Sequence, residues 1–281
     1  MRNRNTVTLL LLGGLFMLIQ PARAQGPYRL EYKLEKGKAY LYGDTISVES
    51  TQEMMGQEQK TSASVLSVTR IVPTALTDDG SAVIELSADS VSMHIKNPQM
   101  DTLIVPRNVF GKRTQLTLSK TGVVSDRKTL DSIVSSGIMR AFGQRESFRF
   151  HRFPAKQVNV GDKWSLPQTD STDAMGGKMI TVATFDYTLK GREARMGKNS
   201  LKLAFSGKMT VTGKGSMMGM QVFVEGSGTV GGTLYVDAMS CMPLYEESKT
   251  DMESTAALTG AQNMTIPSSQ TVITHRALVS Q

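Results

Sequence analysis

Residues that could perform chemistry are few and scattered in this sequence. None of the three histidines, His94, His151 and His275, has a second metal-ligating side chain at the close spacing typical of zinc sites. Cys241 is the single cysteine, so neither an intramolecular disulfide nor a thiolate cluster can form. We therefore expect no cofactor and no enzymatic activity. A dispersed catalytic triad stays open as an alternative, and it would need one histidine beside a carboxylate in a cleft.

The run Gly226–Gly231 matches the letters of a dinucleotide-binding loop, G-x-G-x-x-G. A dinucleotide site needs a strand, a turn and then a helix N-terminus that holds the pyrophosphate. Strand-forming residues follow here instead, Thr233 to Val236. The glycines therefore predict a bulge or a bend in a strongly curved sheet.

Methionine is unusually frequent and clustered. A flexible thioether suits a pocket for variable apolar ligands, so we take the clusters as candidate ligand-binding residues. Cu(I) binding by thioethers is an alternative, and core packing without any ligand is another. Trp164, at the mouth of a predicted strand, is added as an aromatic candidate. The candidate set is Met175, Met179, Met217, Met218, Met220 and Trp164.

Five tripeptides join an aspartate to a serine or threonine and then to an aliphatic residue or threonine. They resemble the O-glycan acceptor motif that one group of Gram-negative bacteria uses on exported proteins. The fifth, at Asp131, falls in a predicted helix and is the poorest candidate. The other four give the candidate acceptors Thr45, Ser90, Thr102 and Ser171.

Alternation of apolar and polar residues dominates the rest of the chain. In Thr114–Ser119, for example, Leu116 and Leu118 share one side and the hydroxyls the other. Turn pairs such as Asp79-Gly80 and Thr121-Gly122 separate these segments. The pattern predicts an all-β, mainly antiparallel fold of about twelve to fourteen strands.

One segment has helical spacing instead. Its apolar residues, from Leu130 through Ile133 to Phe142, form a single stripe, Asp126 can cap its start, and Gly143 follows its end. We predict one amphipathic helix at about 127–142, which would cover the concave face of a curved sheet.

The order of features is similar in two halves of the chain. Each half opens with a glycine followed by an aromatic residue, at Tyr40 and Trp164, and each continues through a Met-Gly turn, at Gly56 and Gly176. This similarity predicts a duplication, with a first half at 25–148 and a second at 149–281. We expect two similar, strongly curved sheets or half-barrels.

The N-terminus has the three parts of a secretory signal peptide. Arg2 and Arg4 provide positive charge, Leu9–Ile19 is apolar, and Ala22-Arg23-Ala24 offers small residues at the cleavage site. We expect residues 1–24 to be removed between Ala24 and Gln25, which leaves a soluble periplasmic or extracellular protein without a transmembrane segment. The remaining basic residues are scattered, which argues against nucleic acid as a partner.

The Gly-x-x-aromatic openings and Met-Gly hairpins resemble those of a family of exported bacterial β-proteins with no established function. The strand-rich order that ends in Leu234–Leu244 is distantly similar to the half-barrel periplasmic carriers of lipoproteins and lipids. That resemblance implies an apolar cavity for acyl chains, although it carries no binding residue over. We expect a non-enzymatic protein that binds a hydrophobic ligand in a Met-lined concave face; the alternative is a structural or interaction protein of the cell envelope.

Overall fold

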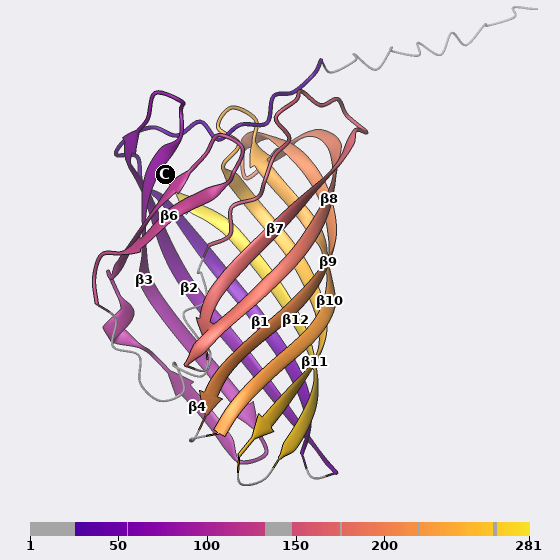
Figure 1. Cartoon of the computed structure of the whole chain (residues 1–281). Helices are drawn as coiled ribbons and strands as arrows, with labels where there is room; N and C mark the ends of the chain where they lie inside the picture. Colours follow the sequence, from indigo (N-terminus) through magenta and orange to yellow (C-terminus); the bar gives the residue numbers. More distant parts are fainter. Residues whose placement is uncertain (1–25, 55, 133–147, 175, 218–219, 261–262) are drawn as a thin grey trace, which may run out of the picture.

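The computed structural model describes residues 26–54, 56–132, 148–174, 176–217, 220–260 and 263–281 (Figure 1). These residues form antiparallel strands, one short 3-10 turn, η1 (Arg107–Val109), and no α-helix. No helix among them is long and apolar enough to cross a membrane. The predicted all-β, antiparallel class is confirmed. The strands are β1 (Tyr40–Met54), β2 (Gln57–Leu76), β3 (Ala82–Asn97), β4 (Met100–Ile104), β5 (Arg113–Leu118), β6 (Val124–Thr129), β7 (Lys163–Ala174), β8 (Gly177–Arg195), β9 (Lys198–Met217), β10 (Met220–Asp237), β11 (Pro243–Thr259) and β12 (Met264–Ser280).

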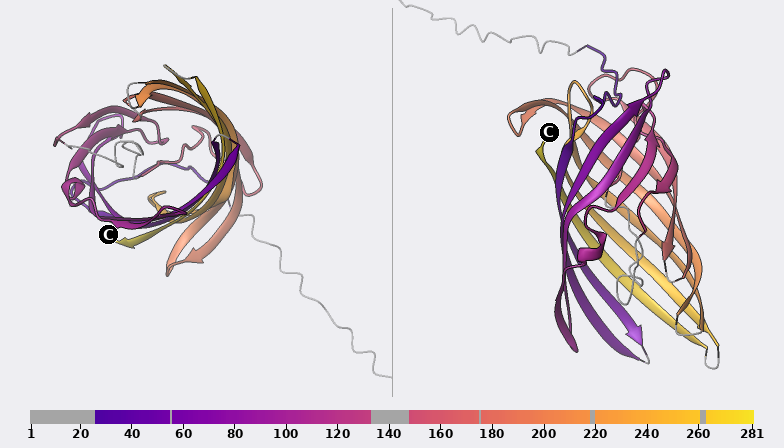
Figure 2. Two further views of the ribbon diagram at one scale, coloured as in Figure 1. Left: turned by 90° about the horizontal axis from the view of Figure 1, so that it is seen from below. Right: turned by 90° about the vertical axis from the view of Figure 1, so that its left-hand side faces the viewer.

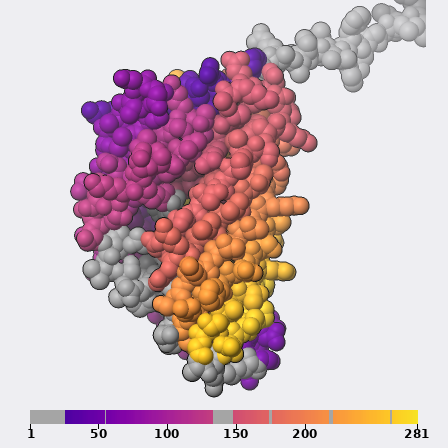
Figure 3. Space-filling model, viewed as in Figure 1, coloured from indigo at the N-terminus to yellow at the C-terminus, as the bar shows by residue number. Residues whose placement is uncertain are grey.

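All twelve strands belong to one sheet with the order β6-β5-β3-β2-β1-β12-β11-β10-β9-β8-β7, and β4 pairs with β3. The chain starts in the middle of the sheet with β1 and meanders outward to β6. It then crosses to the opposite edge at β7 and meanders back to β12, which lies beside β1 (Figure 1). Figure 3 shows the side of the molecule where β7 and β8 run diagonally across the surface.

The prediction of two separate sheets is wrong. β1 and β12 pair from Leu41–Ser280 to Gln52–Ser268, so backbone hydrogen bonds join the first and last parts of the chain into one continuous ladder. Long strands with a polar and an apolar face can pair in either arrangement, and the alternation alone does not choose between one sheet and two.

The predicted helix is wrong for its first turn. Residues 124–129 form β6, which pairs with β5 from Leu118–Val124 to Thr114–Thr129. The amide of Leu130 continues this ladder by donating to the carbonyl of Arg113 at 2.9 Å. Hydrogen bonding to β5 therefore overrides the helical spacing, and the part of the prediction at 133–142 lies outside the described residues.

The sheet curls strongly, and two connecting segments lie on its concave side at its upper end (Figure 2). They are the N-terminal residues 26–39 and residues 148–162 of the connection from β6 to β7, both without regular strands. Their aromatic rings pack together and against the concave face of the sheet. Tyr32 lies 5.0 Å from Phe153, and Phe148 lies 4.6 Å from Tyr42 of β1, between ring centroids. The main hydrophobic core is therefore at this end.

Glycines on the concave face of β9 and β10 allow the tight curl. Across these strands each inward glycine lies opposite a larger side chain, as at Gly232–Phe205 and Gly228–Met209. A Cβ at Gly228 would collide with the backbone carbonyl of Asp251 on β11. The run Gly226–Gly231 lies within the continuous strand β10 rather than before a helix, and it pairs in regular register with both β9 and β11.

Candidate functional site

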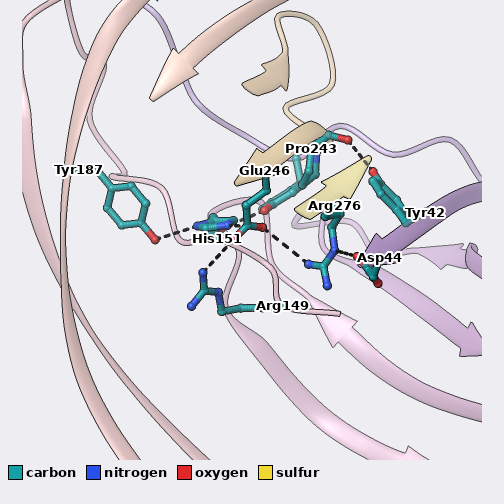
Figure 4. A network of polar contacts seen from close by, with 9 residues as sticks. Tyr42, Asp44, Arg149, His151, Tyr187, Pro243, Glu246 and Arg276 are labelled. Atoms are coloured by element: carbon teal, nitrogen blue, oxygen red, sulfur yellow. Dashed lines mark hydrogen bonds and ion pairs between the residues drawn. The ribbon is translucent and has the colours of Figure 1, made fainter. Parts of the chain in front are cut away.

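A cluster of charged side chains is buried on the concave face at the lower boundary of the core (Figure 4). Asp44 of β1, Arg276 of β12 and Glu246 of β11 occupy adjacent positions on three neighbouring strands. Arg276 donates from Nε to Asp44 Oδ1 at 2.6 Å, and its Nη1 lies 3.8 Å from Glu246 Oε2. On each strand, the charged side chain points to the same concave face as the apolar residue two positions away. This placement explains why the charged side chain is buried.

The segment that connects β6 to β7 adds two more members to this cluster. Arg149 donates from Nη2 to Glu246 Oε1 at 3.0 Å. His151 Nε2 lies 3.1 Å from Glu246 Oε2 in a bent geometry, and neither atom has an aligned hydrogen-bond partner among the described residues. His151 Nδ1 lies 3.1 Å from the hydroxyl of Tyr187. These contacts fix the connecting segment to both β8 and β11.

Burial and neighbouring charges set the protonation of the cluster. Burial raises the pKa of Glu246, but His151, Arg149 and Arg276 outweigh it and hold that pKa well below the usual range. At Asp44 burial outweighs Arg276, so the pKa of this carboxyl is raised. Burial lowers the pKa of His151 against the attraction of Glu246. His151 is therefore neutral at pH 7, and the two guanidinium groups keep Glu246 ionised.

We expect acid to destabilise the protein through His151. In the unfolded chain this imidazole takes up a proton as the pH falls through about 6.5, whereas burial lowers its pKa in the folded protein. Below that pH the unfolded state therefore binds more protons than the folded state, and acid lowers the free energy of unfolding. The urea midpoint should fall between about pH 7.5 and about pH 5. It should fall less in His151→Gln. An equal fall in both proteins would assign the dependence to other groups.

The cluster has the composition of an acid–base site but not its accessibility. His151 and Glu246 are each at most 3% exposed. Burial also raises the pKa of Tyr187 to about 12 and that of Cys241 to about 11, so neither provides an anionic nucleophile at neutral pH. His94 lies 2.6 Å from Asp101, but both are exposed on β3 and β4. The arrangement can hold the connecting segment in place, because His151 and Glu246 are closed off from solvent, whereas His94 and Asp101 lie on the exposed surface.

Below the charged cluster the concave face becomes apolar. Ile46 and Val48 of β1 lie beside Val65 of β2 and Val272 of β12, and all four are half-buried. At the same level, Thr250 of β11 separates Val272 from Val230 of β10, which belongs to the main core. We call Ile46, Val48, Val65 and Val272 the apolar band. It forms the inward wall of the sheet between the filled upper end and the hairpins of the lower rim.

A second hydrophobic cluster lies at the lower rim, separate from the main core. Val222, Val224 and Leu258 are its buried members. A belt of small or polar inward residues, including Ser254 and Ser268, lies between this cluster and the apolar band. The partly buried residues that pack against the lower hydrophobic cluster are Met179, Met220, Ala256, Met264 and Ile266.

The structure brings together two of the candidate methionines and separates Trp164 from them. Met179 and Met220 pack against the lower cluster. Trp164 instead lies in the main core, stacked on Tyr187 with ring centroids 5.5 Å apart. Met217 pairs with Met220 through the backbone at the β9–β10 hairpin, and nothing is described of its side chain. Met175 and Met218 lie outside the described residues.

The four candidate glycan acceptors all have exposed side chains: Thr45, Ser90, Thr102 and Ser171. The aspartates before three of them are engaged in ion pairs. Asp44 pairs with Arg276, Asp89 with Arg70 at 2.5 Å, and Asp101 with His94. These aspartates therefore contact basic side chains of neighbouring strands, whereas glycosylation of the hydroxyls stays a prediction.

Comparison with known proteins assigns no family to this chain. No protein-family model matches it, and no curated protein matches its sequence. Among the described residues, no group of three or more His, Cys, Asp or Glu side chains is arranged to hold a metal ion. Its function must therefore be inferred from the geometry of the sheet.

Proposed function

We propose that this chain is an exported, non-enzymatic protein that binds an apolar ligand, a lipid or an acyl chain, on its concave face. The observation that carries this proposal is the apolar band. Ile46, Val48, Val65 and Val272 point inward and are only half-buried, and they lie below the aromatic segments that fill the upper end. Apolar side chains that gather on one face and stay partly exposed are typical of a surface that binds a ligand.

The dimensions of the concave face suit an extended chain. From Thr274 to Met264, β12 runs roughly 33 Å at ~3.3 Å per residue. Along this line the apolar band and the lower cluster offer two contact regions, separated by the belt near Ser254 and Ser268. Each methylene group that a ligand buries contributes about 0.8 kcal/mol.

Methionines supply an adaptable entrance at the lower rim. Met54 lies at the end of β1, Met100 at the start of β4, Met220 at the start of β10 and Met264 at the start of β12. All four are partly buried. Unbranched thioether side chains adjust to ligands of different shape at little cost. Because the upper end is filled, the ligand enters past these residues.

A matched pair of variants on one strand tests this proposal. Val272 points inward within the apolar band, and its neighbour Ile273 points outward and is 39% exposed. Val272→Glu should weaken binding of the apolar dye N-phenylnaphthylamine about tenfold or more, because a carboxylate on the concave face must be desolvated by the ligand. Ile273→Glu should leave binding unchanged. Val272→Thr, which keeps the shape of the side chain, should give a smaller loss with an unchanged melting temperature.

Three results would count against an apolar ligand. The wild-type protein could fail to bind the dye, both glutamate variants could lose affinity equally, or an acyl-chain lipid could fail to displace the dye. Binding of Cu(I) in competition with a chelator, without dye binding, would favour the thioether metal site instead.

A further inference from the structure

The outer face of the sheet carries a groove that the concave-face proposal does not use. Two adjoining hollows of about 490 and 830 Å³ lie over β10, β11, β12, β1 and β2. They share the lining residues Thr51, Ser227, Glu253 and Ser269, so they form one continuous depression. The strong twist explains it, because a coiled sheet is saddle-shaped and its outer face is hollow along the strands.

Carboxylates dominate the charged lining of this groove, which we call the acidic groove. Among the described residues Lys60 is the only cation that lines it, and its Nζ is 3.1 Å from Glu58 Oε1. Asp251 is engaged by Lys249 at 2.8 Å. Six carboxylates line the groove, and the four besides Glu58 and Asp251 have no ion pair with any described residue. The six carboxylates of the lining are Glu49, Glu53, Glu58, Glu225, Asp251 and Glu253.

The placement of these acids is unfavourable for the isolated sheet. Glu53 and Glu58 are directly opposite each other on β1 and β2, and like charges at opposed positions destabilise a strand pair. Glu253 lies two strands from β1, on β11, and Glu225 lies on the next strand, β10; both are exposed at the same end of the groove. A positively charged partner relieves this repulsion, which gives the groove a preferred kind of occupant.

The spacing of the acids distinguishes between kinds of cation. Among the described residues, no three carboxylates converge closely enough to hold a metal ion. The charges are instead spread over four strands, β2, β1, β11 and β10, with hydroxyls of Thr51, Ser227 and Ser269 between them. Separated charges and neutral hydrogen-bonding groups match a chain that carries cationic side chains at intervals.

We propose that the acidic groove docks an extended, basic polypeptide segment of a partner protein. Lysine or arginine at every second position would place all the cations on one side of such a segment. The unpaired carboxylates Glu53, Glu225 and Glu253 would face those cations. This surface is on the opposite side of the sheet from the apolar band, so the two proposals can fail separately.

The test uses two fluorescein-labelled peptides of ten residues. In the first, lysine alternates with threonine; in the second, the same lysines are contiguous. Fluorescence anisotropy is measured with the purified protein, with Glu53→Gln/Glu225→Gln/Glu253→Gln, and with the control Asp173→Asn/Asp186→Asn/Glu247→Gln. The control removes the same charge from exposed positions that do not line the groove.

We expect the alternating peptide to bind more tightly than the contiguous one, and added salt to weaken binding. The groove variant should lose about tenfold in affinity and the control variant less than about twofold. Equal losses in the two variants would reduce the effect to net charge and overturn the proposal. So would equal binding of both peptides, no binding by the wild-type protein, or equally strong binding of the small polycation spermine.

Discussion

Glu246→Gln is expected to lower the free energy of unfolding by about 3–5 kcal/mol. The carboxylate is the common partner of Arg149, His151 and Arg276, with contacts of 3.0, 3.1 and 3.8 Å. An amide in its place removes the carboxylate partner of the partly buried Arg149 and leaves the buried Arg276 with its carboxylate partner Asp44. The penalty therefore comes mainly from the positive charge that Glu246 no longer balances, and urea unfolding at pH 7 measures it.

Glu247→Gln is the matched control for this change. Glu247 follows directly on β11, but it points outward and is exposed. Its substitution should change stability by less than about 0.5 kcal/mol. A Glu246→Gln protein as stable as the Glu247→Gln protein would show that the charged cluster does not anchor the segment between β6 and β7.

The second large effect is expected at Gly232, where alanine should destabilise the protein by about 1–3 kcal/mol. A Cβ there would collide with the carbonyl of Glu247 on β11, lie 2.8 Å from the ring of Phe205 and lie 2.9 Å from the Cα of Ser248. Two of these contacts are with the backbone of a neighbouring strand, so relief requires the sheet to open. Thermal or urea unfolding of Gly232→Ala measures the cost.

Gly231→Ala provides the comparison on the same strand. Gly231 points outward, and the nearest atom to an added Cβ is the carbonyl oxygen of Phe205 at 3.8 Å. This substitution should be neutral or stabilise the fold by up to about 1 kcal/mol, because alanine reduces the entropy of the unfolded chain. Equal effects at the two glycines would contradict the role of inward glycines in the curl.

Local patterns in the sequence identify many of the strands and turns. The alternation in Thr114–Ser119 predicts a strand, and β5 covers all but its last residue, with Leu116 and Leu118 buried as expected. The predicted turns at Gly80 and Gly122 both have the positive φ that favours glycine. These features depend on neighbours in sequence, which is why a single sequence is sufficient to find them.

Features that depend on distant pairing were missed or misread. The helical stripe near residue 130 is a local signal, but β5 needs a partner at the sheet edge and takes residues 124–129 into β6. The similar order of features in the two halves suggested two sheets. Pairing between β1 and β12, at opposite ends of the chain, joins them into one.

The charged cluster was also missed, although the sequence contains a usable signal. Glu246 shares its strand parity with Leu244, Arg276 with Leu278, and Asp44 with Tyr42, and all three of these neighbours are buried. A charged residue that stands two positions from a core residue, on the buried face of an alternating strand, is therefore a sign of a buried ion pair. Its partner cannot be named from one sequence, because it depends on strand register and on the connection that brings in Arg149 and His151.

Native mass spectrometry of the protein purified from its own host, without detergent, tests the proposed function most directly. The account predicts an added mass that organic solvent removes and that corresponds to an acyl-chain lipid, with less of it on the Val272→Glu protein. Repeated preparations at the mass of the polypeptide alone, from a protein that also fails to bind the apolar dye, would contradict it.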